Sequence, residues 1–352
     1  MADRRPNFHM VRNDWSSLLP ELLRLIMIRL LVKDIIRASA VCKAWYESSV
    51  SFRKNDRYPW FMKYSLSSSI RPCELYDPMQ RMTYFTYFPE IRGMSVHHAK
   101  DGWLLMYKVH SSELFFFNPF TRKIISLPSC EYYNESAAFT CAPTSEGCLV
   151  FGMTNIDRNN NIVGINTLKL GETEWETTDF MSFGHPFASN NKVIFLEGLF
   201  YCLVGLNWIA VFDPSKRTLN NYCVEYDRSI TLLAGMYFVE IKGDIFFIKA
   251  DSEKLRFFRL NRNKTWSWEE KDRIDEASTI FGASCGTECR LDLPNYLRNK
   301  LLLSNAPHPM IKTYFFDEGM YLTNDSRARF WDTTSIYQCV WIEHPKQCLD
   351  FI

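Results

Sequence analysis

Two histidines, His97 and His98, stand next to each other and form the only cluster among the seven histidines of the chain. Histidine is a common metal ligand, but successive side chains of a β-strand point to opposite faces, so both imidazoles cannot easily reach one ion. Cys285 and Cys289 are four residues apart and lack the second pair that a structural zinc site requires. The sequence therefore predicts no metal site, and it predicts buried thiols at the two cysteines.

Motifs that would indicate an enzyme are scarce. The chain has no glycine-rich phosphate-binding loop and no His-Glu-x-x-His zinc motif. We predict no catalytic residues, no cofactor and no bound metal. We therefore look for the function in the helices and strands that the sequence predicts.

Composition favours a folded, strand-rich protein. Of the 352 residues, 47% are hydrophobic and 15% are aromatic, which allows a large core and suits the half-buried faces of strands. The net charge is +1, from 41 basic and 40 acidic residues. This balance gives no reason to expect nucleic acid or a membrane surface as a partner.

The cysteines bear on the compartment. Eleven is an odd number, so they cannot all pair within one chain, and no apolar leader precedes them. We expect a reducing, intracellular location, in the cytoplasm, the nucleus or both. The longest apolar stretch near the N-terminus, Leu18 to Val32, includes Pro20, Glu21 and two arginines and cannot span a bilayer.

Helical periodicity is confined to the first fifty residues. Leu18, Leu22, Ile26 and Leu30 recur every four residues, as on one face of a helix. Two shorter helical segments are predicted, at 35–38 and 41–46. Three helices in about 35 residues bury too little surface to stand alone. Their apolar face must pack either on the rest of this chain or on another protein, and the pattern leaves both open.

The stretch from Asp14 to Leu23, Asp-Trp-Ser-Ser-Leu-Leu-Pro-Glu-Leu-Leu, resembles the opening of an F-box. The segments Lys-Asp-Ile-Ile-Arg at 33–37 and Ala-Val-Cys-Lys-Ala-Trp at 40–45 follow the family in register. Leu31 and Ser39 depart from its usual residues. The ending Val-Cys-Lys-x-Trp is similar to that of plant F-boxes.

The resemblance implies a three-helix unit that binds a Skp-type adaptor, which in turn binds a cullin. The residues that it implies for this interface are Leu19, Pro20, Leu22, Ile26, Leu30, Val41 and Trp45. A cluster of large apolar side chains is also what the centre of a protein interface requires. The alternative is that some of them, Val41 and Trp45 first, only hold the helices together.

From residue 58 onward, short apolar and aromatic runs alternate with turn residues, which predicts many short strands. One turn recurs: an aromatic residue, Asp or Asn, Pro, two variable residues and Arg, at 76–81, 117–122 and 212–217. The side chain of Asp or Asn can accept a hydrogen bond from a backbone N–H group two residues later, and Pro fixes φ at the value that a type I turn requires. We expect the Arg to begin the outgoing strand. Degenerate turns at 170–173 and 260–263 each lead into a tryptophan.

A glycine followed by a hydrophobic strand precedes each turn, beginning at Gly102, Gly147, Gly198, Gly243 and Gly319. We interpret these glycines as points of close backbone approach. A period of 40 to 50 residues built of strands is typical of propeller blades. About six blades are predicted, although the irregular segment 280–312 leaves five or seven open. A large β-sandwich is the alternative, but it has no reason to repeat this turn.

The chain has Tyr-Pro-Trp-Phe-Met at 58–62, Phe-Asn-Pro-Phe-Thr-Arg at 117–122 and Val-Trp-Ile-Glu at 340–343. On these residues most of the segment 58–345 resembles, more loosely, the kelch-like C-terminal domain of plant F-box proteins, without the Gly-Gly doublet of kelch blades. We therefore predict an α+β protein with an F-box at 12–50, a linker at 51–69 and an all-β propeller at 70–345. The propeller would capture a target protein that the sequence does not identify.

The resemblance implies a substrate-recognition subunit of a Skp–cullin–F-box (SCF) ubiquitin ligase that has no catalysis of its own. Two alternatives stay open. One is an adaptor-binding protein that regulates or stores a partner without ubiquitination. The other is a propeller enzyme with acids such as Asp77, Asp213, Asp244 or Asp332 around its channel, although Asp77 and Asp213 already have a role in turns.

Overall fold

The structure is a computed structural model that describes most of the chain. The described residues are 15–27, 30, 37–53, 58–66, 71–78, 82–108, 113–130, 135–157, 159–181, 193–204, 207–225, 236–250, 255–272, 274, 278–283, 286–291, 293, 298–304, 311–316, 320–323 and 337–343. The chain divides into two compact units, and the boundary lies between Arg57 and Tyr58.

The first unit is helical. It contains a 3₁₀ turn (η1, Trp15–Ser17), helix α1 (Pro20–Met27), a helical stretch at 37–39 and helix α3 (Lys43–Arg53). Pro20 opens α1, because the first turn of a helix needs no N–H from that residue. Leu23 and Met27 are fully buried, and Met27 and Ala38 form a small core with the partly buried Leu30 and Trp45.

The second unit consists of strands in five hydrogen-bonded sheets, one of which has eight strands. In chain order they are β1 (Trp60–Ser65), β2 (Cys73–Asp77), β3 (Met82–Thr86), β4 (Ser95–Lys100), β5 (Trp103–Lys108), β6 (Glu113–Phe117), β7 (Ile124–Ser126), β8 (Ser136–Phe139), β9 (Leu149–Asp157), β10 (Ile162–Lys169), β11 (Glu176–Met181), β12 (Val193–Leu196), β13 (Leu199–Leu203), β14 (Trp208–Asp213), β15 (Thr218–Glu225), β16 (Met236–Ile241), β17 (Asp244–Ala250), β18 (Leu255–Asn261), β19 (Trp266–Lys271), β20 (Thr279–Ala283), β21 (Gly286–Arg290), β22 (Lys300–Ser304), β23 (Ile311–Phe315), β24 (Met320–Thr323) and β25 (Tyr337–Ile342). A short 3₁₀ turn, η2 (Pro89–Ile91), precedes β4.

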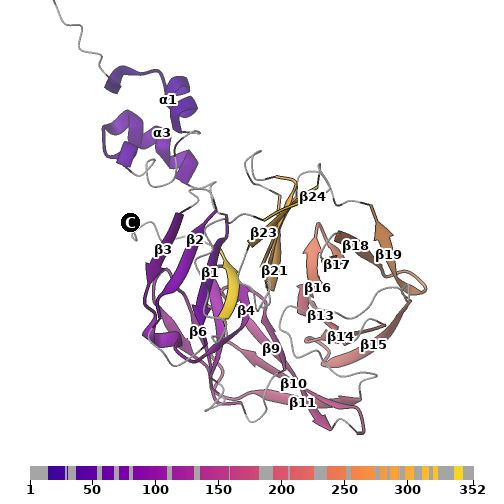
Figure 1. The fold of residues 1–352 in the computed structure, drawn as a ribbon. Helices are drawn as coiled ribbons and strands as arrows, with labels where there is room; N and C mark the ends of the chain where they lie inside the picture. Colours follow the sequence, from indigo (N-terminus) through magenta and orange to yellow (C-terminus); the bar gives the residue numbers. More distant parts are fainter. Residues whose placement is uncertain are drawn as a thin grey trace, which may run out of the picture. The chain divides into compact units, whose positions relative to one another are not determined.

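These strands form six blades, numbered here in chain order. Blade 1 has the order β25-β1-β2-β3, blade 2 is β4–β7 and blade 3 is β8–β11. The eight-stranded sheet is blade 4 (β12–β15) joined to blade 5 (β16–β19) by a short parallel contact between β15 and β19. Blade 6 is β20–β24. The blades follow one another around a common axis (Figure 1), which confirms the predicted propeller among the described residues.

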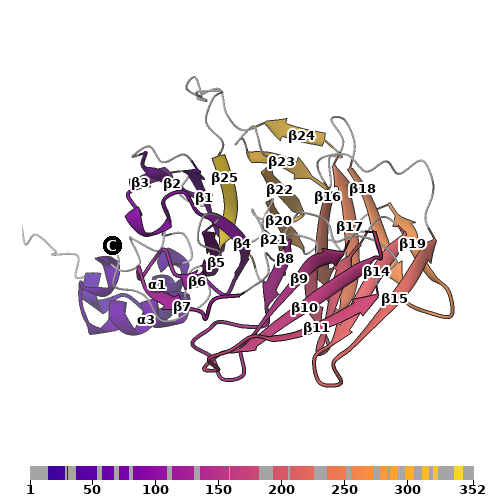
Figure 2. The same ribbon diagram turned by 90° about the horizontal axis from the view of Figure 1, so that it is seen from below.

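The ring closes by strand pairing. The last strand, β25, pairs antiparallel with β1 along its whole length, from Trp60 opposite Ile342 to Ser65 opposite Tyr337. The two ends of the described propeller therefore lie in one sheet, where the yellow β25 runs beside the indigo β1 (Figure 2). Such closure removes one exposed sheet edge and ties the beginning of the domain to its end.

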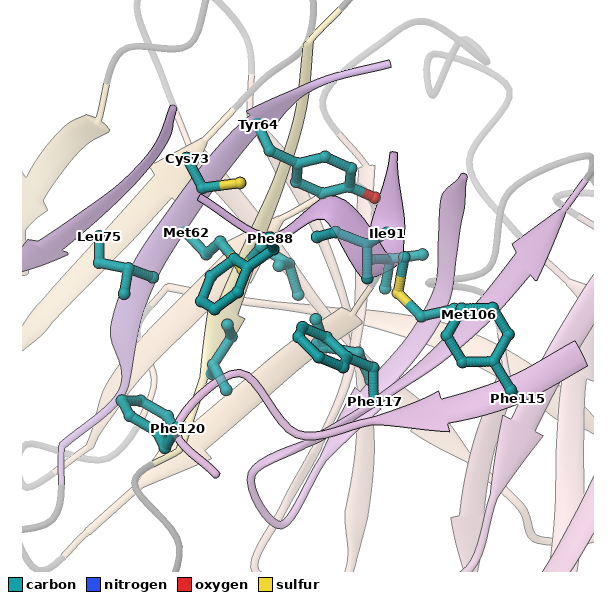
Figure 3. Close-up of a cluster of buried hydrophobic side chains, with 14 residues drawn as sticks. Met62, Tyr64, Cys73, Leu75, Phe88, Ile91, Met106, Phe115, Phe117 and Phe120 are labelled. Atoms are coloured by element: carbon teal, nitrogen blue, oxygen red, sulfur yellow. The ribbon is translucent and has the colours of Figure 1, made fainter. Parts of the chain in front are cut away.

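The core lies between the blades. Six clusters of buried side chains each join two successive blades, and the sixth joins blade 6 back to blade 1. Figure 3 shows the cluster between blades 1 and 2, in which Met62 and Phe88 face Met106 and Phe117. Inner strands such as β5, β14 and β17 are therefore buried on both faces, which explains the continuous apolar runs in the sequence.

Strand β5 shows how one strand serves two clusters. Leu104 and Met106 belong to the cluster with blade 1, whereas Leu105 and Tyr107 belong to the cluster with blade 3. All four side chains are at most 5% exposed. This division follows directly from the two-residue period of a strand.

The repeated glycines have a different role from the one predicted. Gly102, Gly198 and Gly243 lie at the second position of two-residue hairpin turns, with φ of 78°, 82° and 83°, and the residue before each glycine also has positive φ. Two positive φ angles define the type I′ turn that suits the twist of a hairpin. A Cβ at Gly147, Gly198 or Gly243 would meet nothing within 4 Å. The expectation of close backbone approach is therefore wrong at these positions, and Gly319 lies outside the described residues.

The recurrent turn has the predicted bonds. The Asn118 side chain accepts bonds from the backbone N–H groups of Phe120 and Thr121, both at 3.0 Å. Asp213 accepts from Ser215 and Lys216 at 2.9 and 3.2 Å. The third copy, at 76–81, is only partly described. The arginine position differs from expectation, since the outgoing strands begin at Ile124 and Thr218, after the arginines, which themselves have positive φ.

Blade 6 accounts for the irregular segment 280–312. Its order is β21-β20-β22-β23-β24, so it has one strand more than the other blades, and β20 pairs parallel with β22. The extra strand, β21, lies next to β16, β4 and β25. The expected linker at 51–69 contains the end of α3 and all of β1.

Candidate adaptor interface

The side chains implied for the adaptor interface fall into two groups in the helical unit. Leu19, Leu22 and Val41 are 63%, 45% and 59% exposed, and Pro20 beside Leu19 is also exposed. Exposed large apolar side chains have no partner for burial within the folded unit. This first group therefore presents an apolar surface to solvent.

The second group faces inward. Ile26, Leu30 and Trp45 are partly buried, and Leu30 and Trp45 pack against Met27 and Ala38. The indole Nε1 of Trp45 donates a bond of 2.9 Å to the backbone carbonyl of Trp15. Trp45 thus ties the end of the unit to its beginning, which is the structural role that the sequence left open for it. Val41 does not share that role, because it is exposed.

The helix geometry explains the division. Leu22 and Leu23 are neighbours on α1, and a step of one residue turns the helix by about 100°. Leu23 faces the core with no exposure, whereas Leu22 points outward. The sequence period alone placed Leu22, Ile26 and Leu30 on one face, but α1 ends at Met27, so Leu30 is not part of that helix.

Three more exposed apolar side chains in the unit were missed by sequence reasoning. Trp15, Leu25 and Tyr46 are each more than half exposed. Together with Leu19, Leu22 and Val41 they are six of the thirteen exposed large apolar side chains among the described residues. A unit of fewer than 60 residues therefore carries almost half of these exposed side chains. The many leucine and aromatic residues near the N-terminus were the sequence feature that could have indicated these exposed side chains.

The candidate metal ligands do not come together. His97 packs on Tyr107 and His98 packs on Phe139, so the two rings lie against different strands. No group of three or more potential metal ligands is found among the described residues. Cys289 is a half-buried thiol whose pKa burial raises to about 12; Cys285 lies outside the described residues.

Sequence reasoning also overlooked a Gly-x-Ser-x-Gly pattern at 282–286. In the α/β-hydrolases this motif forms a sharp turn from a strand to a helix. Here Gly282 lies in β20 and Gly286 opens β21, and the two strands pair antiparallel with Ala283 opposite Gly286. The described residues on the two sides of the motif therefore belong to two paired strands, whereas a nucleophile elbow leads from a strand into a helix.

The aspartates considered for an enzyme lie at strand ends. Asp77 ends β2, Asp213 ends β14, and Asp244 opens β17 with an ion pair of 3.0 Å to Arg259. Asp332 lies outside the described residues. No helix in the described part of the chain has the length and apolar character needed to cross a membrane.

Comparison with known proteins identifies both units. A family model described as the F-box domain matches residues 15–57, and one described as the KIB1-4 beta-propeller matches residues 75–345. Three similar proteins of Arabidopsis thaliana are each 33% identical. F-box protein At4g00893 aligns over 96% of this chain and 87% of its own length. F-box/kelch-repeat protein At1g57790 aligns over 97% of both, and F-box protein At3g56470 over 94% and 89%. Both resemblances stated from the sequence are confirmed, and the chain belongs to the family of F-box proteins that carry a KIB1-4 beta-propeller.

Proposed function

We propose that this protein is the substrate-recognition subunit of an SCF-type ubiquitin ligase. The F-box unit binds a Skp-type adaptor and, through it, a cullin, while the propeller captures a target protein. The protein supplies no catalytic group. It acts by holding the target close to the ubiquitin-charged enzyme, which raises the effective concentration of the reactants.

The observation that carries this proposal is the exposed apolar surface of the F-box unit. Leu19, Leu22 and Val41 remain exposed although the unit has a core of its own. Covering such side chains with a partner contributes roughly 25 cal/mol per Å² of apolar surface. We assign Leu19, Pro20, Leu22 and Val41 to direct adaptor contact. We assign Ile26, Leu30 and Trp45 mainly to holding the helices in the binding-competent arrangement.

The cysteines support a reducing compartment. Nine described cysteines are free thiols, and five of them are buried. We place the protein in the cytosol, the nucleus or both, where free thiols persist.

Neighbouring leucines on α1 provide a matched test of the interface. Leu22→Ala removes an exposed side chain, so we expect at least about ten-fold weaker adaptor binding with unchanged thermal stability. Leu23→Ala leaves a cavity in the small core and destabilises the helical unit by about 2–5 kcal/mol. Adaptor affinity by calorimetry and helicity by circular dichroism separate the two effects. Equal adaptor affinity of Leu22→Ala and wild type would contradict the assignment of Leu22.

The ligase step requires a separate measurement. In a reaction reconstituted with adaptor, cullin and a bound target, we expect ubiquitin transfer to depend on both units of this chain. Stable binding of the target without any transfer would instead favour an adaptor-binding regulator.

A further inference from the structure

A pocket lies on the axis of the propeller, where the first strands of the blades approach one another. Its volume is about 190 Å³. Its walls come from all six blades: β4 with the turn that follows it, β8, β12, β16, β21 and Glu343 directly after β25. Pockets for drug-sized ligands are larger, at roughly 300–1,000 Å³, so this one fits a group the size of a single side chain.

The charged side chains in the wall of the pocket are mostly acidic. Asp101, Glu240, Glu288 and Glu343 line it, and Lys100 is the only lysine or arginine among its described lining residues. Asp101 and Glu240 each accept one backbone N–H bond at the rim, from Ala142 at 3.0 Å and from Gly243 at 2.6 Å. The excess of carboxylates gives the pocket a preference for a positively charged group.

Two of the carboxylates share one arginine unequally. Arg290 Nη1 lies 2.5 Å from Glu343 Oε1 but 3.4 Å from Glu288 Oε1. Glu343 therefore has a close charged partner, whereas Glu288 has only a long contact. The Glu288 side chain is 32% exposed and hydrogen-bonds to Glu343. A partly buried carboxylate that has another carboxyl group close by and no close cation is costly to ionise, so Glu288 is the group that gains most from an added cation.

Two polar atoms at the pocket have no hydrogen-bond partner among the described residues. They are Nδ1 of His98 and Oγ1 of Thr287, and both are enclosed from solvent. Enclosed polar atoms are normally paired, so these two atoms offer hydrogen-bonding capacity to a ligand. Burial, with a further contribution from Lys100, lowers the pKa of His98 to about 3. The imidazole is therefore neutral at physiological pH and does not repel a cation.

We propose that the central pocket binds an ammonium or guanidinium group, with Glu288 as its main charge partner and Thr287 as a hydrogen-bond acceptor. Two sources have this chemistry: a small free amine, or a lysine or arginine side chain of a bound protein. The proposal does not depend on adaptor binding, since every residue that it uses belongs to the propeller.

A proton must leave when the cation binds. Burial and the nearby Glu343 carboxylate raise the pKa of Glu288 well above the usual glutamate range. The other titratable or charged groups around it are Arg290 and Cys289 on β21, His98, Lys100 and Asp101 at β4, and Glu240 and Lys242 at β16. A cation beside Glu288 stabilises its ionised form, so binding releases up to one proton and strengthens as the pH rises.

The test is calorimetric titration of the full chain with probes that differ only in charge or source. The probes are n-butylammonium, n-butylguanidinium, the uncharged n-butanol, and a short capped peptide with one central lysine. Titrations in two buffers of different ionisation enthalpy measure the number of protons that binding releases. We compare wild type with Glu288→Gln and Thr287→Val. Glu113→Gln serves as the control, because Glu113 is an exposed glutamate paired with Lys108 on blade 2.

We expect the charged probes to bind wild type and the Glu113→Gln control alike, with proton release, and n-butanol not to bind. Glu288→Gln should weaken binding at least about ten-fold and abolish proton release, and Thr287→Val should weaken it less. Binding of n-butylammonium without binding of the peptide indicates a free ligand, whereas peptide binding at least as tight as that of n-butylammonium indicates a target side chain. Absence of binding by every charged probe, or equal binding by a folded Glu288→Gln variant, would overturn the proposal.

Discussion

At the scale of single residues, the arginines of the repeated turns connect neighbouring blades. Arg122, in the turn of blade 2, donates a bond to the backbone carbonyl of Tyr87, which lies between blades 1 and 2. Arg217, in the turn of blade 4, donates to Thr167 and Thr178 of blade 3, at 3.1 and 2.5 Å. Both arginines have positive φ, so the backbone accepts an unfavourable conformation where the side chain reaches the preceding blade.

Truncating Arg217 tests this role. Arg217→Ala removes two hydrogen bonds to hydroxyl groups that are partly buried, and we expect the free energy of unfolding to fall by about 1–2 kcal/mol. The ion pair with Glu176 adds little, because that carboxylate is 64% exposed. Urea unfolding monitored by tryptophan fluorescence gives the value.

The neighbouring Lys216 is the control, since it is 75% exposed and its ion pair stays within the turn, at 3.1 Å from Asp213. Lys216→Ala should change stability by less than about 0.5 kcal/mol. If the two variants lose equal stability, the arginine does not connect the blades.

The turn shows what sequence could and could not predict at this scale. Its side-chain to backbone bonds are local, within three residues, so the types of residue alone predicted them. The partners of Arg217 lie 39 and 50 residues earlier in the chain. No local pattern encodes such a contact, and the expectation that the arginine starts the next strand failed for that reason. The prediction for the repeated glycines failed for a similar reason, because their role in a hairpin turn depends on the register in which the two strands pair.

At the scale of elements, β21 is the strand that departs from the blade pattern. It adds a fifth strand to blade 6 and brings Glu288 close to Glu343. The sequence indicated only that the segment is irregular. The sequence of β21, Gly-Thr-Glu-Cys-Arg, is short and of mixed polarity. The strands that lie next to it, β16, β4 and β25, are distant in the sequence. Period and composition could therefore predict neither its position nor the acidic pocket.

The stability of the propeller should depend on the protonation of Glu288. The pKa of Glu288 is raised in the folded protein, so the folded state binds a proton that the unfolded state has lost. Its contribution is fully present below the pKa of the unfolded chain and declines as the pH rises above that value. The Glu288→Gln variant has no carboxyl group that titrates at this position, so its stability does not decline in this way as the pH rises.

We therefore expect the stability of Glu288→Gln relative to wild type to increase between about pH 4 and about pH 7. Urea midpoints of both proteins across this range measure the difference. A constant difference would mean that the pKa of Glu288 is the same in the folded protein as in the unfolded chain, which would contradict the raised pKa.

At the scale of the whole molecule, two units with different kinds of apolar surface are joined in one chain. The propeller buries its apolar strands in six clusters between blades and closes through β25 and β1. The helical unit keeps Leu19, Leu22 and Val41 exposed. Six of the thirteen exposed large apolar side chains among the described residues lie in this short helical unit and seven in the much longer propeller. For its length, the F-box unit therefore exposes more apolar surface that a partner could cover.

Much of this organisation was predictable. Helical and strand periods separated the two units, and the repeated turn gave the blade count of about six, which matches the described strands. Exposure was not predictable, since Leu22 and Leu23 are the same residue type at adjacent positions and differ only in the direction that packing gives them. The target also stays unassigned, because the specificity of a propeller resides in the detailed shape of its loops.

The most direct test of the central claim is the affinity of the purified full chain for a Skp-type adaptor, measured beside the double variant Leu19→Ala with Pro20→Ala. The control is Phe85→Ala, which removes an equally exposed side chain from β3 of the propeller. We predict tight binding by wild type and the control, and at least about ten-fold weaker binding by a folded double variant. Failure of the wild-type protein to bind any Skp-type adaptor would contradict the proposed role in a ubiquitin ligase.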